Sequence, residues 1–153
     1  MTKFIYKAQK KKILEKLSYY GITKLPHLLI PSGKEKIRGY SGDLSMDEIS
    51  NLGNIANMEN IGLYLFHEYE TEIRLSTDAI HILKDQITKN ILVLNKDQKQ
   101  MWFKGQDIPI PDEWKNQENG FRVLKFEDDF IGCGKLVDDR LINYMPKERR
   151  IKA

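Results

Sequence analysis

The chain has 153 residues, of which 41% are hydrophobic and 31% charged. The length is typical of one domain, and the composition excludes a wholly disordered chain and a membrane protein. No apolar run approaches the roughly 18 residues of a spanning helix, and the N-terminus lacks the apolar core of a secretory signal. The single cysteine, Cys133, excludes an internal disulfide and a zinc site with two or more thiolates. We therefore expect a soluble, cytoplasmic domain.

The charge is distributed unevenly along the chain. The net charge is +3, but residues 1–24 carry +6, the last seven residues carry +3, and residues 25–146 carry −6. Two basic ends around an acidic body suit a protein that binds a polyanion such as nucleic acid. Solubility alone also explains lysine-rich ends. If both ends contact one RNA, residues 7–16 and 147–152 are expected on the same side of the fold.

The N-terminal half is expected to contain a basic amphipathic helix, a turn-rich stretch, a short helix and a second turn, over residues 8–20, 26–42, 46–52 and 54–60. Apolar residues at the spacing of one helical face indicate the first helix, and Gly21 can end it. Ser45 and Glu48 have the spacing of a capping box, which predicts the start of the short helix.

The remainder of the chain is expected to consist mostly of short strands. A hairpin is expected over 61–69 and 70–75, and a helix capped by Ser76 or Thr77 follows it. Next come a buried strand, a hairpin loop leading into an apolar segment, and three closing strands, over residues 90–95, 96–99, 101–103, 121–126, 130–137 and 140–144. These elements predict an α+β domain built around a small mixed barrel.

No motif in the sequence indicates catalysis. A phosphate-binding glycine loop and a dinucleotide fingerprint are absent from the sequence, and the three histidines are far apart. Cys133 lies between two glycines on an expected strand, with no histidine near it in sequence. A small buried thiol is the preferred interpretation, although folding could bring a histidine to it. We predict no enzymatic activity, no cofactor and no metal.

The C-terminal stretch has two features that suit RNA binding. Gly132 and Gly134 lie on the same face of an expected strand and leave a bare strip where a backbone can approach. Lys147, Arg149 and Arg150 follow the last strand and suit phosphate binding. The alternatives are that the glycines relieve a tight barrel interior and that the basic residues form a solvated tail. The residues alone leave both pairs of interpretations open.

The same stretch resembles a known domain. The pattern Gly-x-Gly-Lys, a hairpin, and then Asn-x-x-Pro-Lys-x-x-Arg is similar to the C-terminal domain of many RNA cytosine-5 methyltransferases of the Sun/nucleolar family, which belongs to the PUA-like group. The matching positions are Gly132, Gly134, Lys135, Leu141, Asn143, Pro146, Lys147 and Arg150. Residues 34–42 also resemble a stand-alone archaeal version of this domain.

The resemblance covers residues 25–151 and divides the chain into a basic N-terminal helix at 1–24 and a PUA-like domain at 25–153. It implies a PUA-like pseudo-barrel that binds structured RNA, generally tRNA or rRNA. It does not extend to methylation, because the chain has neither the cofactor-binding domain nor cysteines beside Pro or Thr.

We therefore predict a stand-alone RNA-binding protein that assists RNA modification or ribosome biogenesis, working with a separately encoded methyltransferase or ribosome-assembly factor. The expected RNA-binding residues are Lys36, Arg38, Tyr40, Gly132, Gly134, Lys135, Asn143, Tyr144, Lys147, Arg149 and Arg150. The cations in this set are expected to meet phosphates, and the tyrosines to stack on unpaired bases. The alternatives are a protein-interaction module that docks on an RNA-modification enzyme through its acidic body, and an enzyme that uses Cys133.

Overall fold

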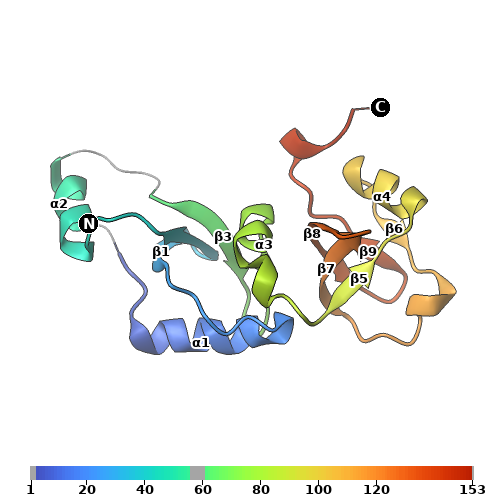
Figure 1. The fold of residues 1–153 in the computed structure, drawn as a ribbon, viewed down its shortest axis with the longest axis horizontal. Coiled ribbons are helices and arrows are strands. Elements are labelled where there is room, and N and C mark those ends of the chain that lie inside the picture. The colour runs from blue at the N-terminus through green and yellow to red at the C-terminus, as the bar shows by residue number, and fades with distance from the viewer. Residues whose placement is uncertain (1–2, 56–60, 153) are drawn as a thin grey trace.

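Two β-sheets lie side by side along the long axis of the molecule (Figure 1). The computed structural model describes residues 3–55 and 61–152. The first sheet has the strand order β1-β2-β3-β4, and the second has the order β5-β7-β8-β9-β6. The strands are β1 Leu28–Ser32, β2 Lys36–Tyr40, β3 Leu63–Glu68, β4 Ile73–Leu75, β5 Ile91–Val93, β6 Ile108–Pro109, β7 Gly120–Phe126, β8 Asp129–Leu136 and β9 Arg140–Ile142. The helices are α1 Lys7–Leu17, α2 Met46–Ile55, α3 Thr77–Leu83 and α4 Lys96–Phe103, with short 3₁₀ turns η1 Ser18–Tyr20, η2 Lys84–Gln86, η3 Asp112–Trp114 and η4 Lys147–Arg149.

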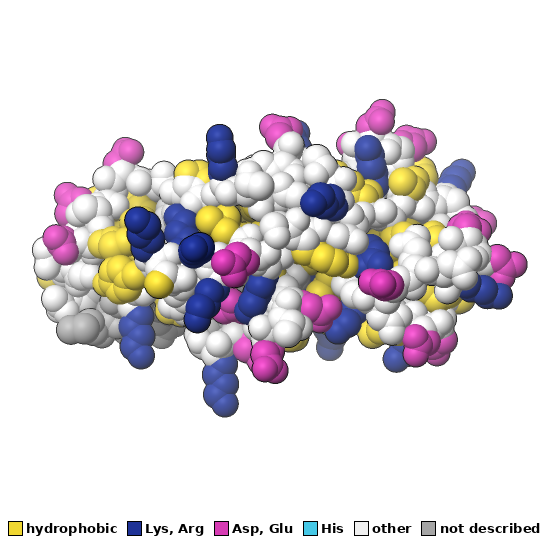
Figure 2. Space-filling model, turned by 90° about the horizontal axis from the view of Figure 1, so that it is seen from below, with side chains coloured by type: hydrophobic (Ala, Val, Ile, Leu, Met, Phe, Trp, Pro, Cys, Tyr) yellow, Lys and Arg dark blue, Asp and Glu magenta, His cyan; other side chains and the backbone are white. Residues whose placement is uncertain are grey.

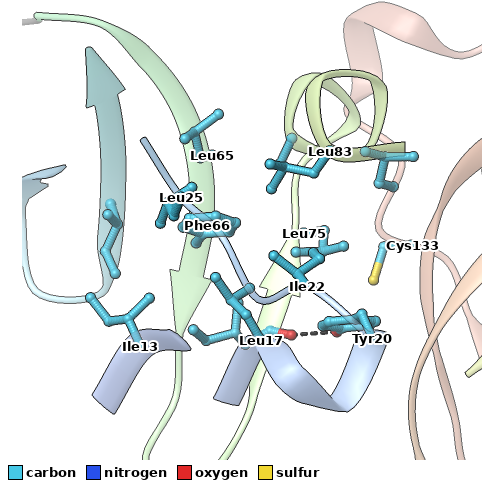
Figure 3. Close-up of a cluster of buried hydrophobic side chains, with 14 of the residues drawn as sticks. Ile13, Leu17, Tyr20, Ile22, Leu25, Leu65, Phe66, Leu75, Leu83 and Cys133 are labelled. Atoms are coloured by element: carbon cyan, nitrogen blue, oxygen red, sulfur yellow. Dashed lines mark hydrogen bonds between the residues drawn. The ribbon is translucent and has the colours of Figure 1, made fainter. Parts of the chain in front are cut away.

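Helix α1 packs its apolar face against the first sheet, as the sequence predicted for a basic amphipathic helix. Ile13 and Leu17 are completely buried. Figure 3 shows them beside Phe66 of β3, with Leu83 of α3 and Cys133 of β8 in the same cluster. Because this cluster contains side chains from both sheets, the two sheets share one hydrophobic core.

The stretch expected to be turn-rich, residues 26–42, has a turn at Gly33, but the strands on either side of it form the antiparallel hairpin β1–β2, which the sequence did not indicate. Leu28 pairs with Tyr40, and Ser32 pairs with Lys36. Pro31 is compatible with β1 because β1 is an edge strand, where a missing N–H does not break the sheet. Gly33 has a φ of +72° and makes the turn.

Helix α4 replaces the hairpin loop expected at 96–99 and the apolar segment expected at 101–103. A capping box begins it: the Asn95 side chain accepts a hydrogen bond from the Gln98 N–H at 2.8 Å, and the Gln98 side chain accepts one from the Asn95 N–H at 2.8 Å. The helix carries Trp102, only 1% exposed, into the core of the second sheet. A helix forms here in place of the expected loop because the Asn95 and Gln98 side chains satisfy backbone N–H groups that a turn would leave to solvent.

The remaining predicted elements are present with small shifts. The hairpin β3–β4 and the meander β7–β8–β9 are antiparallel, and β5 pairs in parallel with β7. Ser76 caps α3 by accepting from the Ala79 N–H. Helix α2 runs three residues beyond its predicted end, and the turn expected at 54–60 lies mostly outside the described residues. Among the described residues, none of the helices has the length and apolar character needed to cross a bilayer.

Candidate functional site

A cavity of about 290 Å³ lies between the two sheets, where β4 and the start of α3 face β8 and the segment that follows β9. Both sheets contribute to its wall. Its lining includes Lys36, Tyr64, Arg74, Asp78, Tyr144 and Arg149. Trp102, Gly132 and Cys133 form part of the lining from the side of the second sheet.

The register of the first sheet aligns two of the cations. Lys36 of β2 pairs with His67 of β3, and His67 pairs with Arg74 of β4. Directly paired residues project to the same face of a sheet, so Lys36 and Arg74 flank His67 in one row. The Lys36 ammonium lies 5.6 Å from the centre of the Tyr64 ring, and His67 Nε2 is 2.7 Å from a carboxylate oxygen of Glu35.

Aromatic rings connect this row to the second sheet. The Arg74 guanidinium lies over the Tyr144 ring, 4.2 Å from its centre. Tyr144 in turn is tilted against Phe121 of β7 at 5.9 Å, and Tyr69 stacks on Phe121 at 5.5 Å. Burial raises the pKa of Tyr69, and the charge of Arg74 offsets part of that rise. The wall of the cavity therefore combines cations with flat aromatic surfaces.

Arg149 adds a third cation from the C-terminal segment. It ends η4, and its guanidinium is 3.6 Å from a carboxylate oxygen of Asp78. The two side chains are 48% and 42% exposed, so solvent screens this ion pair and it contributes little to stability. Because the pair is weak, Arg149 can exchange Asp78 for a phosphate at small cost.

Four of the residues predicted from sequence meet in the cavity wall: Lys36, Gly132, Tyr144 and Arg149. The others lie elsewhere. In the first sheet, the Arg38 guanidinium donates to the carbonyls of Ile61 at 3.3 Å and Gly62 at 2.8 Å. The Tyr40 hydroxyl accepts from the Leu44 N–H at 3.1 Å. Arg38 and Tyr40 therefore hold neighbouring loops in the described structure, and RNA contacts by them stay predictions.

The remaining predicted cations differ in their surroundings. Lys135 forms an ion pair with Glu72 at 3.2 Å. Arg150 donates from Nε to the Met145 carbonyl at 3.0 Å, and its side chain lies against Gly105. Lys147 is exposed at the start of η4.

Asn143 ties the end of β9 to the loop after α4. Its side-chain amide donates to the carbonyls of Trp102 and Gln106, both at 2.9 Å, and its side-chain oxygen accepts from the Met145 N–H at 2.8 Å. These bonds fix the point from which Tyr144 and the basic segment extend.

The strip above Gly132 and Gly134 is filled by the indole ring of Trp102. A Cβ at Gly132 would lie 2.9 Å from Cζ2 of Trp102, and a Cβ at Gly134 would lie 3.1 Å from Cζ3. Gly134 is also close to the carbonyl of Ile142, at 2.9 Å from the same imagined Cβ. These contacts support the interpretation that the glycines relieve a tight interior.

Arg74, Tyr64 and Asp78 are cavity residues that the sequence reasoning missed. No local motif marks them, since they are single polar or aromatic positions in short elements. The available signal was the predicted hairpin at 61–75, which places an arginine beside a tyrosine-rich strand. The cavity also needs the second sheet, whose position no local pattern specifies.

The two basic ends do not lie on one side of the fold, so that prediction was wrong. In Figure 1, α1 runs along the lower edge of the molecule, whereas η4 and the C-terminal residues stand at the upper edge of the opposite half. The apolar face of α1 accounts for the position of the helix, because Ile13 and Leu17 pack in the core beside Phe66 of the first sheet.

Cys133 does not have the surroundings of a nucleophile. It is 5% exposed and belongs to the shared core. Burial raises the pKa of its thiol to about 11, so the thiol is protonated at neutral pH. Within residues 3–55 and 61–152, no group of three or more His, Cys, Asp or Glu side chains is arranged to hold a metal ion.

Comparison with known proteins identifies the class of this fold. The family model for the PUA domain of the methyltransferase RsmF matches residues 89–151, which include all strands of the second sheet from β5 to β9. The chain thus contains a PUA-like domain resembling the C-terminal domain of the Sun family, and this class of domain indicates RNA binding.

The solved structures extend the likeness to the whole fold. A conserved PUA domain protein from Thermoplasma acidophilum superposes with a TM-score of 0.61 over 97% of each chain, at 15% sequence identity. The predicted α+β, PUA-like architecture is thereby confirmed. None of the curated proteins matches the chain.

Proposed function

We propose that the chain is a stand-alone RNA-binding protein and that the cavity between its sheets binds an unpaired nucleotide of a structured RNA. One observation supports this most strongly: Arg74, Arg149 and Lys36 surround the same cavity as the Tyr64 and Tyr144 rings. Single-stranded nucleic acid is commonly bound by this combination, in which aromatic rings stack on bases and cations meet the backbone.

The cavity residues would bind different parts of the nucleotide. Tyr64 and Tyr144, which both line the cavity, offer ring surface to a base. Arg149 exchanges its screened partner Asp78 for a phosphate, and its planar guanidinium can engage two phosphate oxygens. Lys36, an exposed residue of the cavity lining, adds a point charge.

The RNA we propose is a folded tRNA or rRNA, which presents unpaired nucleotides in loops and bulges. We also propose that the protein holds such an RNA for a separately encoded modification enzyme or ribosome-assembly factor.

Photo-crosslinking tests this function directly. Purified protein is mixed with RNA from its own cells labelled with thiouridine and irradiated, and the cross-linked peptides and RNAs are identified. We expect cross-links in the peptides that contain Tyr64 and Tyr144, and enrichment of tRNA or rRNA. Cross-linking should persist in Tyr144→Phe, which keeps the ring, and fall in Tyr144→Ala.

The same experiment decides between RNA binding and protein docking. A module that docks on a partner enzyme through its acidic body would give no specific RNA cross-links at the cavity. Such a result would reject the proposal.

A further inference from the structure

Helix α1 presents lysines whose charge no described residue neutralises. Lys3, just before α1, and Lys7 and Lys11 within it are exposed, and among the described residues none of the three forms an ion pair. We call these three residues the lysine face. The acidic residues gather near the other end of the helix, where Glu15, Glu68 and Glu70 share a groove with Lys12 and Lys16.

The other side of α1 is fixed to the protein. Ile13 and Leu17 are completely buried. The Lys10 ammonium donates to the His27 carbonyl at 2.9 Å, and the Lys16 ammonium is 3.0 Å from a carboxylate oxygen of Glu68. A membrane-surface helix needs its apolar face to enter the lipid boundary, and here that face is used by the core. The lysine face therefore suits a ligand that carries negative charge, such as a phosphate backbone.

The lysine face does not stabilise the helix that carries it. The first turn of α1 contains no acidic residue, and cations near a helix N-terminus are unfavourable. Lys7 and Lys11 are four positions apart, a spacing at which like charges repel. A requirement of the native fold thus does not account for the lysines.

The position of the lysine face separates it from the cavity. Figure 1 places α1 along the lower edge, away from η4 at the upper edge. Seen from below, several dark-blue side chains lie over the half of the molecule where α1 lies, and others are spread over the other half (Figure 2). A single-stranded RNA segment that occupies the cavity therefore does not continue directly onto the lysine face.

We propose that the lysine face is a second RNA contact, which binds the sugar–phosphate backbone of a base-paired segment while the cavity holds an unpaired nucleotide. This inference rests on the proposed function of the cavity. Lysine ammonium groups meet phosphates as point charges and read no base, so the contact accepts duplex of any sequence. The protein then bridges two segments of one folded RNA.

Two probes separate the contacts: a blunt RNA duplex, which offers backbone only, and a short single-stranded RNA. The variant Lys3→Gln/Lys7→Gln/Lys11→Gln should lose about tenfold or more in duplex affinity, and its slope of log K against log salt should fall by about three units. Its affinity for the single strand should be unchanged. The matched control, Lys84→Gln/Lys96→Gln/Lys104→Gln, removes three exposed lysines elsewhere and should keep both affinities.

The outcomes distinguish the two proposals. If the lysine-face variant and the control bind duplex equally, the second contact is wrong. If Arg74→Ala/Arg149→Ala binds the single strand as tightly as the parent does, the cavity proposal is wrong. The duplex affinity of the lysine-face variant still shows whether α1 contacts RNA.

Capture provides the test of bridging. The parent protein bound to immobilised duplex should retain labelled single-stranded RNA. The lysine-face variant and Arg74→Ala/Arg149→Ala should not retain it. The inference would be overturned if binding of one RNA excluded binding of the other. It would also be overturned if anionic lipid vesicles displaced the bound duplex more effectively than unlabelled duplex does.

Discussion

The Arg74 guanidinium lies over the ring of Tyr144 at 4.2 Å, although Arg74 is in β4 of the first sheet, Tyr144 follows β9 of the second sheet, and the two are 70 positions apart in the chain. This contact joins β4 to the segment after β9 at the wall of the cavity. Because a cation over an aromatic ring favours one arrangement of the two surfaces, the pair helps to set the width of the cavity.

Replacement of Arg74 separates binding from stability. Arg74→Ala should cost roughly 0.5–2 kcal/mol of folding free energy, the range of a cation–π contact. Its effect on RNA affinity should be larger, because the variant also removes a positive charge from the cavity. Thermal unfolding and RNA titration of the same samples give both values. A variant with parental RNA affinity would exclude Arg74 from the site.

The neighbouring arginines of the C-terminal segment should behave differently. Arg149→Ala breaks only a screened pair with Asp78, so stability should hold while RNA affinity falls and the salt slope shrinks by about one unit. Arg150 donates to the Met145 carbonyl and lies against Gly105. Arg150→Ala should therefore lower the melting temperature and weaken RNA binding through loss of the orientation of η4. Equal effects of the two variants would contradict this division.

Gly134 should be intolerant of any side chain. A Cβ there would lie 2.9 Å from the Ile142 carbonyl, and backbone cannot yield as a flexible side chain can. Gly134→Ala should destabilise the fold by about 1–3 kcal/mol in chemical denaturation, with RNA affinity of the folded fraction unchanged. Gly132→Ala should reduce both the free energy of unfolding and the RNA affinity, because Gly132 also lines the cavity. If Gly134→Ala melts like the parent and binds RNA poorly, its backbone is an RNA contact after all.

The Cys133 thiol predicts a pH dependence of stability. Its pKa is raised by burial from 9.0 to about 11, so the unfolded chain loses this proton at lower pH than the folded chain. The contribution of the protonated Cys133 thiol to the free energy of unfolding is fully present below pH 9. It is lost between about pH 9 and 11, at up to roughly 1.4 kcal/mol per pH unit. Comparison of the parent with Cys133→Ala over this range isolates the effect, because other groups titrate in both. A thiol reagent that reacts rapidly with the folded protein at neutral pH would contradict the burial and reopen catalysis.

The sequence predicted those elements whose signals are local. The meander β7–β8–β9 follows from apolar runs separated by acidic turns, and α1 follows from one apolar face. The strands β1 and β2 and the helix α4 were missed for different reasons. Pro31 and Gly33 indicated a turn, which Gly33 makes, but Pro31 lies in an edge strand, which accepts proline. Asn95 and Gln98 form a capping box inside a stretch that was interpreted as a hairpin loop.

The candidate site was predictable only in part, for a physical reason. Tyr144 and Arg149 lie in the segment that resembles a known domain, so the sequence indicated them. Arg74 and Tyr64 reach the cavity only because the shared core, which includes Leu75 and Cys133, packs one sheet against the other. Such packing depends on contacts between distant parts of the chain, which periodicity and motifs do not encode.

The most direct test of the account is RNA affinity over a salt series for Lys36→Ala/Arg74→Ala/Arg149→Ala beside the control Lys84→Gln/Lys96→Gln/Lys104→Gln. Both variants lose three positive charges, but only the first changes the cavity. The account predicts that the cavity variant, while still folded, loses about tenfold or more in affinity for a structured RNA and about three units of salt slope, and that the control retains both. Equal binding by the two variants would contradict the claim that this cavity is where the protein binds RNA.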